Sequence, residues 1–231
     1  KPDYRWNDEE LTEQVYLNHL IGTQSIGVQP CNENSNARFG VVDVDPKNYT
    51  NFDKKFFIDI IQNYNLPLIP ILSKSGGLHL YLFMSEFVPA VLIRSFLSNL
   101  LPLFKLKPDC EIFPKQTQLT KDNETGQLNK GNFINLPYFK KSERVAINVD
   151  GKAFTFDQFI EVLESNTATP EKLKTITESI EQKDLEGVDE EFDDGPPCLA
   201  HLSKIMKNPG FDGKDRFMYN YHVFVKMKYG D

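Results

Sequence analysis

The chain has 231 residues, of which 40% are hydrophobic, so it can bury the core of one domain with an appendage or of two small domains. No apolar run reaches the roughly 18 residues that span a bilayer, and the opening residues contain no apolar signal segment, so we expect neither a membrane span nor a signal peptide. The net charge is −7, but nine acidic residues and only one lysine lie between positions 178 and 194. The rest of the chain is close to neutral, and a polyanionic ligand is therefore not excluded.

Strand and helix signals alternate along the first 165 residues, which indicates a mixed α/β or α+β class. The predicted helices cover residues 6–22, 51–65 and 89–104 and a segment from Thr155 onward, with Asn7 or Asp8 as cap of the first helix. The predicted strands cover residues 25–30, 38–45, 66–72, 78–84, 109–114 and 131–139. We expect a core over residues 1–165, an acidic linker or surface helix over 166–194 and a small helical module over 195–231.

The three cysteines Cys31, Cys110 and Cys198 are odd in number and widely spaced. This pattern argues against a disulfide framework and favours a reducing, cytoplasmic compartment. The chain opens on Lys1 rather than on methionine, and we expect it to be a piece of a longer protein.

The stretch "FGVVDVDP" (39–46) places two carboxylates at the end of a predicted core strand. Because residues i and i+2 of a strand point to the same face, Asp43 and Asp45 project together. Two carboxylates on one face suit a divalent cation with oxygen ligands, such as Mg²⁺ or Mn²⁺. A solvated turn is an equally good interpretation of this motif alone, and glycosyltransferases also use Asp-x-Asp to hold a metal and a diphosphate.

A second motif, "LSKSGGLHLYLF" (72–83), combines hydroxyl groups, one cation and two glycines with a histidine on the strand that follows. Such a loop can surround phosphate oxygens with hydroxyl and backbone N–H groups. The motif consists of Ser73, Lys74, Ser75, Gly76, Gly77 and His79. A plain hairpin turn followed by a core histidine is the alternative.

A third motif, "DCEIFPKQ" (109–116), places Glu111 between apolar neighbours at a strand position, with Asp109 as its rival on the same face. A third carboxylate beside Asp43 and Asp45 would complete a two-metal site for phosphoryl displacement. An ordinary edge strand with an exposed acid is the alternative.

In this order, "VVDVDP", "SKSGGLHLYLF" and "DCEIFPKQ" followed by "GNFINLPYF" resemble the archaeo-eukaryotic primase-polymerases of phages, plasmids and bacterial defence systems. The resemblance covers about residues 15–165. It implies an α+β fold, in which an α/β part and an RRM-like sheet enclose the acids in a cleft and a small helical module follows. It also implies a bacterial, phage or plasmid context.

The resemblance implies site roles for ten residues. Asp43, Asp45 and Glu111 would be the catalytic ligands of Mg²⁺ or Mn²⁺, and His79 and Ser75 would bind the triphosphate. Ser73, Lys74, Arg38, Lys115 and Asn135 would be further nucleotide contacts. The chain departs from many members at Gly77, where they have Ser, and at Glu111, where they have Asp.

The implied activity is template-directed transfer of an NTP or dNTP to a 3′-hydroxyl on a single-stranded DNA template, with de novo primer synthesis as a further expectation. A helicase is a common neighbouring domain in similar proteins. The competing interpretations are a glycosyltransferase, a metal-dependent nuclease and a non-catalytic nucleic-acid-binding subunit. The tail begins with "GPPC", as the iron–sulfur domain of the primase large subunit does, but no cysteine follows Cys198. We therefore expect a buried cysteine there and no cluster.

Overall fold

The computed structural model describes residues 6–7, 11–49, 51–121, 129–140, 142–185, 223–224 and 226–227. Contacts divide the chain into two compact units, Lys1–Lys174 and Thr175–Asp231. The described part of the second unit is helical, whereas most of the predicted module at 195–231, including Cys198, lies outside the described residues. No helix in the described ranges is long and apolar enough to cross a membrane.

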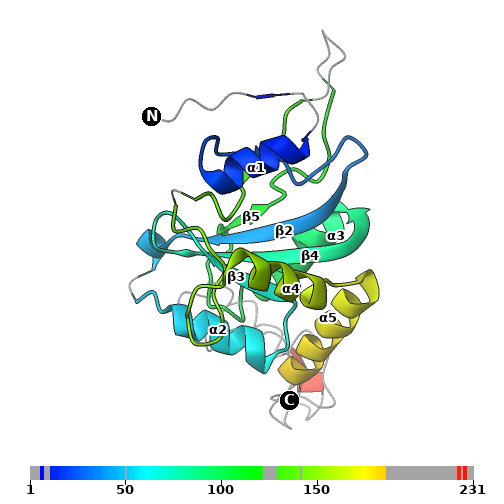
Figure 1. Ribbon diagram of the computed structural model, residues 1–231. Coiled ribbons are helices and arrows are strands. Elements are labelled where there is room, and N and C mark those ends of the chain that lie inside the picture. The colour runs from blue at the N-terminus through cyan, green and yellow to red at the C-terminus, as the bar shows by residue number, and fades with distance from the viewer. Residues whose placement is uncertain are drawn as a thin grey trace. The chain divides into compact units, whose positions relative to one another are not determined.

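A four-stranded antiparallel sheet forms the centre of the first unit, with the strand order β3-β4-β2-β5. Its strands are β2 (Asn36–Val44), β3 (Leu68–Leu72), β4 (Leu78–Pro89) and β5 (Glu111–Phe113). Helix α2 (Lys54–Asn63) connects β2 to β3, and helix α3 (Ala90–Leu100) connects β4 to β5. This β-α-β-β-α-β order is the split β-α-β arrangement that RRM domains share (Figure 1). The expected α+β fold with an RRM-like sheet is confirmed.

Helix α3 covers one face of this sheet. Val42, Val44 and Leu80 are fully buried on that face. Gly40 allows the close approach of α3, because a Cβ atom at this position would lie 2.3 Å from Ile93 and 2.9 Å from Leu97. A larger residue at Gly40 would therefore push α3 off the strand that carries the Asp-x-Asp motif.

The opposite face of the sheet is covered by a second layer. Strand β1 (Gly27–Val28) pairs antiparallel with β6 (Ile134–Asn135). Helix α4 (Phe156–Asn166), which lies close to β3 in Figure 1, contributes to the same core as β6. The shared core consists of Val41, Ile69, Ile71, Tyr81, Phe113, Ile134, Ala146 and Phe159. Because side chains alternate along β2, Asp43 lies on this same face, two residues beyond Val41.

Helix α1 (Glu13–Ile21) is attached to the second layer through His19. Its Nδ1 accepts a hydrogen bond from the backbone N–H of Ile26 at 3.1 Å, and its Nε2 lies 2.8 Å from the carbonyl oxygen of Pro137. Burial lowers the pKa of His19, so the neutral ring that makes both contacts is favoured. The helix begins after the extended residue Thr12 rather than after the predicted caps Asn7 or Asp8.

The first unit continues past the predicted boundary at residue 165. The backbone N–H of Ala168 donates to the carbonyl oxygen of Phe83 at 2.8 Å, and the N–H of Ser85 donates to the carbonyl oxygen of Ala168 at 2.9 Å. Helix α5 then spans Pro170–Leu185. Residues 166–174, which the sequence assigns to the acidic linker, thus fall inside the first compact unit.

Candidate active site

The strand register brings the three sequence motifs together. Asp43 on β2 is paired with His79 on β4 and with Glu111 on β5. Residues directly opposite on neighbouring strands point to the same face, with Cβ atoms roughly 4.5–5.5 Å apart. His79, Asp43 and Glu111 therefore form one row across three strands, which we call the cross-strand row.

Each carboxylate of the cross-strand row has a basic partner. His79 Nε2 lies 3.3 Å from Asp43 Oδ1, and the histidine side chain is only 13% exposed. Lys115 Nζ lies 2.9 Å from Glu111 Oε1 and 5.1 Å from the centre of the Phe113 ring. The charge of Lys115 offsets part of the repulsion between the two neighbouring carboxylates.

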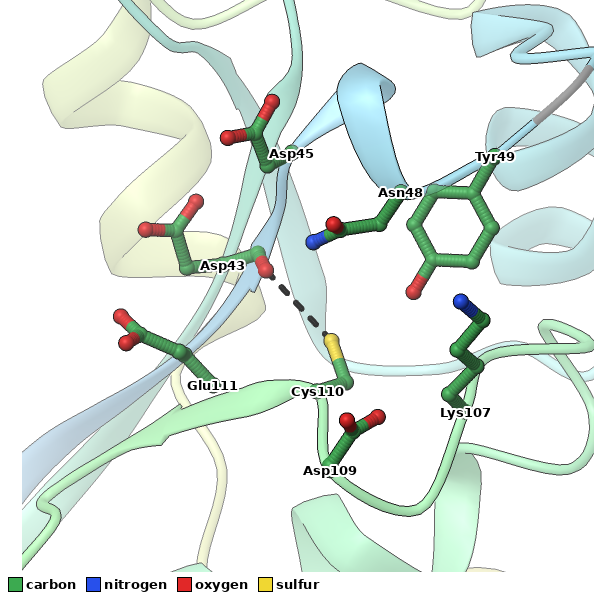
Figure 2. A pocket seen from close by; sticks show the side chains of 8 residues that line it. All are labelled: Asp43, Asp45, Asn48, Tyr49, Lys107, Asp109, Cys110 and Glu111. Carbon is green, nitrogen blue, oxygen red and sulfur yellow. Dashed lines mark hydrogen bonds between the residues drawn. The ribbon is translucent and has the colours of Figure 1, made fainter.

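Asp45 follows the last residue of β2 and begins a short 3-10 helix, Pro46–Asn48. Its Oδ1 accepts a hydrogen bond from the backbone N–H of Lys47 at 3.1 Å, so the side chain caps that turn. Figure 2 shows the carboxylates of Asp43, Asp45 and Glu111 one above the other on one side of the site. The side-by-side placement that alternation predicts for the two aspartates thus agrees with the structure.

A pocket of about 280 Å³ adjoins the cross-strand row (Figure 2). It is lined by Asp43, Asp45, Asn48, Tyr49, Lys107, Asp109, Cys110 and Glu111. In Figure 2 the carboxylates of Asp43, Asp45 and Glu111 lie on one rim of the pocket. The side chains of Asn48, Tyr49 and Lys107 lie on the other rim. We call this cavity the β2–β5 pocket.

The sequence did not single out Asn48, Tyr49, Lys107 or the pocket role of Cys110. These residues follow β2 or precede β5, in segments with no periodic pattern. Only the pairing of the two strands brings them to one cavity, so no local sequence signal could have identified them.

Two side chains of the β2–β5 pocket, Cys110 and Tyr49, are joined by a hydrogen bond and are protonated. Cys110 Sγ donates to the backbone oxygen of Asp43 at 3.4 Å, and the Tyr49 hydroxyl forms a hydrogen bond with Cys110. Burial raises the pKa of Tyr49 to about 12 and also raises the pKa of Cys110. Both groups are therefore neutral at neutral pH, and Cys110 is not an activated nucleophile.

The β3–β4 hairpin turn packs against the end of β2. A Cβ atom at Gly77 would lie 2.1 Å from the backbone oxygen of Val44 and 2.7 Å from Cδ of Pro46. This close approach leaves no room for a side chain at Gly77. It also fixes the turn next to Asp45.

The hydroxyl groups of this turn have different surroundings. Ser73 is buried, and its Oγ accepts a hydrogen bond from the backbone N–H of Gly77 at 3.0 Å. Ser75 and Lys74 are exposed, and Ser75 Oγ lies 2.9 Å from Ser73 Oγ. The structure therefore gives Ser73 a role inside the turn and presents Lys74 and Ser75 to solvent.

We expect Ser73→Ala to lower the free energy of unfolding by about 1–3 kcal/mol, because the buried N–H of Gly77 loses its acceptor. Ser75→Ala is the matched variant, and it should change stability by less than about 0.5 kcal/mol because Ser75 is exposed. Urea unfolding followed by circular dichroism measures both values. Equal losses in the two variants would contradict this assignment.

The two remaining predicted contacts lie in different places. Arg38 donates from Nη2 to the backbone oxygen of Ser85 at 3.0 Å and lies five residues before Asp43, about 16 Å along an extended strand. The structure thus does not bring Arg38 to the cross-strand row.

Asn135 lies close to the cross-strand row. Its backbone oxygen accepts a hydrogen bond from the Tyr81 hydroxyl at 3.3 Å, and Tyr81 neighbours His79 on the same strand face. Asn135 Oδ1 is buried and has no hydrogen-bond partner in the described chain.

The acidic residues provide the donor chemistry of a magnesium or manganese site. Both ions prefer oxygen ligands, and Asp43, Asp45 and Glu111 supply up to six carboxylate oxygens at neighbouring backbone positions. Within the described ranges, no three His, Cys, Asp or Glu side chains are gathered closely enough to hold a metal ion.

The split β-α-β sheet, with an Asp-x-Asp motif, a histidine and a further acid beside one another, agrees with the arrangement that the resemblance to archaeo-eukaryotic primases implies. The family described as "TOTE conflict system, Archaeo-Eukaryotic Primase domain" matches residues 5–179, and the chain belongs to this family. A comparison with curated proteins found no match. The expected resemblance is confirmed, and the family is of the primase-like, nucleotidyltransferase type.

Proposed function

We propose that this protein is a template-directed nucleotidyltransferase that adds an NTP or dNTP to a 3′-hydroxyl on single-stranded DNA. The observation that carries the proposal is the register of β2, which places His79 on one side of Asp43 and Glu111 on the other. Family membership supports the same class of chemistry. De novo primer synthesis by the same site is a further part of the proposal.

In the proposed reaction, the 3′-hydroxyl oxygen forms a bond to the α-phosphorus of the incoming nucleotide. The bond from that phosphorus to the pyrophosphate oxygen breaks, and the hydroxyl proton passes to solvent. Asp43, Asp45 and Glu111 would hold Mg²⁺ or Mn²⁺, which when bound neutralises charge on the attacking and leaving oxygens. His79, with the exposed Ser75 and Lys74 of the neighbouring turn, would bind and orient the β- and γ-phosphates.

Two or three carboxylates at one site suit this chemistry. Mg²⁺ is commonly bound by one or two carboxylates together with substrate phosphates, rather than by a cage of protein ligands. Glu111 is paired with Lys115, and Asp43 lies beside His79. We propose that a nucleotide and a divalent cation bind together and that the basic partners then turn to the phosphates.

Replacing His79 by Ala is expected to raise the KM for the incoming nucleotide by about tenfold, because a contact to a charged phosphate is lost. The affinity for the template strand should stay within about twofold, since His79 is 13% exposed and lies beside Asp43 rather than on an open surface. Steady-state extension at varied dNTP and fluorescence anisotropy of labelled template measure the two effects. A loss of template affinity without a change in KM would show that His79 is not a phosphate contact.

Extension of a labelled primer on a DNA template with Mn²⁺ and each dNTP in turn tests the proposed function. The expected product is one nucleotide longer and forms only with the complementary dNTP. Shortened primer would indicate a nuclease, and an unchanged primer that still binds would indicate a non-catalytic subunit. Hydrolysis or transfer from a sugar nucleotide, with no extension, would indicate a glycosyltransferase.

A further inference from the structure

A second pocket, of about 300 Å³, lies on the face of the sheet that carries the shared core. It is lined by side chains of α1, β2, β4, the segment after β6 and α4. Three of the lining rings lie nearly parallel, because the Tyr81 ring makes an angle of 19° with Phe39 and of 13° with Phe83. We call this cavity the aromatic pocket.

The polar groups on three of the lining side chains already have partners inside the protein. The Tyr81 hydroxyl donates to the backbone oxygen of Asn135 at 3.3 Å, and the Tyr138 hydroxyl lies 3.2 Å from the backbone oxygen of Phe154. Both ring nitrogens of His19 lie within hydrogen-bond distance of backbone groups. A polar ligand would lose its hydrogen bonds to water in this pocket without replacing them, which costs free energy. The aromatic pocket therefore favours an apolar group over a nucleobase or a sugar.

Apolar side chains continue from the aromatic pocket onto the surface of α1. Tyr16 and Leu20 line the pocket, and Leu17 and Ile21 lie beside them, since residues three and four apart are neighbours on a helix. Tyr16, Leu17 and Ile21 are exposed to solvent. We call these four residues the α1 stripe. A small molecule would fill the pocket but leave Leu17 and Ile21 exposed, whereas adjoining exposed apolar residues are typical of a protein-binding surface.

The described charges next to the lining residues are mainly acidic. Exposed acids lie one turn before Tyr16 and directly after two lining residues of α4, namely Glu13, Asp157 and Glu164. Lys140, two residues beyond the lining residue Tyr138, is offset by Glu143 in the same turn. Such a border repels phosphate groups and attracts basic side chains.

We propose that the aromatic pocket and the α1 stripe bind an amphipathic helix of a partner protein, with an aromatic or leucine side chain in the pocket and basic residues beside the acids. Apolar residues at positions i, i+3, i+4 and i+7 are the usual anchors of a helix in such a groove. A second copy of this chain, docked by the same face, would bring acids against acids, so the partner is a different polypeptide. None of the proposed metal-binding or nucleotide-binding residues lines the aromatic pocket, so this docking does not depend on the proposed function.

The first test measures the affinity of the whole chain for a fluorescein-labelled helical peptide with leucines and one phenylalanine on one face and lysines on the other. We expect fluorescence anisotropy to show binding, and Leu17→Asp to raise the Kd at least about tenfold, because it places a charge in the apolar contact. Val91→Asp changes an exposed apolar residue on α3, outside the pocket, and should stay within about twofold of the wild type.

The same peptide with glutamates in place of its lysines tests the charge of the partner. We expect it to bind at least about tenfold more weakly than the lysine peptide. The proposal is overturned if the lysine peptide does not bind, if the two peptides bind equally, or if Leu17→Asp binds as the wild type does.

The second test identifies the occupant directly. The photoreactive residue p-benzoylphenylalanine replaces Tyr16 in the whole chain, and the protein is irradiated with the lysine peptide. Mass spectrometry should find the crosslink on the peptide, and the same photoreactive residue at Val91 should give little of it. A crosslink to a second copy of the chain, or to residues 195–231 of the same chain, that the peptide does not displace would overturn the proposal.

Discussion

Replacing Asp43 by Asn is expected to reduce primer extension by at least about 100-fold, the usual scale for loss of one electrostatic contact to a reacting group. Asn has nearly the same shape as Asp but no negative charge, so it binds a divalent cation poorly. The side chain is 30% exposed and contacts His79 rather than the apolar core, so the fold should be retained. Primer extension at saturating Mn²⁺ and dNTP measures the loss.

The matched control for this variant is Asp59→Asn. Asp59 lies on α2 and is paired with Lys55, 2.7 Å away, at an exposed position outside the pocket. It should extend primers at the rate of the wild type. Extension by Asp43→Asn within about twofold of this control would show that Asp43 is not part of a metal site.

Replacing Gly77 by Ala is expected to lower the free energy of unfolding by about 1–3 kcal/mol, the usual cost of forcing a methyl group into a packed site. The new Cβ would lie 2.1 Å from a backbone oxygen at Val44, and backbone atoms cannot move aside as a flexible side chain can. Relief of the clash would move the β3–β4 turn away from Asp45, so extension should fall as well. Urea unfolding and primer extension measure the two effects.

The neighbouring glycine provides the control for this prediction. A Cβ atom at Gly76 meets no other atom within 4 Å, but the residue has a φ of +84°. Asn tolerates the left-handed region better than most residues, so Gly76→Asn should cost less than about 1 kcal/mol. A larger loss for Gly76→Asn than for Gly77→Ala would contradict the packing explanation.

Much of the fold could be predicted from the sequence, because its signals are local. Alternation along "FGVVDVDP" predicted that Asp43 and Asp45 share a face, and the apolar runs around them predicted the strands that form the sheet. The RRM-like sheet and the grouping of the motif residues into one site were implied by the resemblance to archaeo-eukaryotic primase-polymerases. The pairing of Asp43 with both His79 and Glu111 could not be read from separate segments, since register depends on contacts between strands.

The sequence predicted the details of the site less well. Ser73 was one of several hydroxyl groups in a loop, and only the structure shows that it is buried against Gly77. Tyr49 and Lys107 belong to no recognisable sequence motif, and they line the same pocket only because β2 and β5 are neighbouring strands. In both cases the position of the side chain depends on contacts made by the tertiary fold, which the local sequence pattern does not contain.

Manganese binding with and without a nucleotide tests the central claim most directly, because the claim is that substrate phosphates complete a metal site begun by Asp43, Asp45 and Glu111. The free Mn²⁺ signal in electron paramagnetic resonance is titrated with protein, in the presence or absence of a non-hydrolysable dNTP. We expect the protein and the nucleotide together to bind clearly more Mn²⁺ than the nucleotide alone, and we expect the protein without nucleotide to bind little. Asp59→Asn should match the wild type. Asp43→Asn should show little of this added uptake. Equal Mn²⁺ uptake by Asp43→Asn and the wild type, or uptake that does not respond to the nucleotide, would contradict the account.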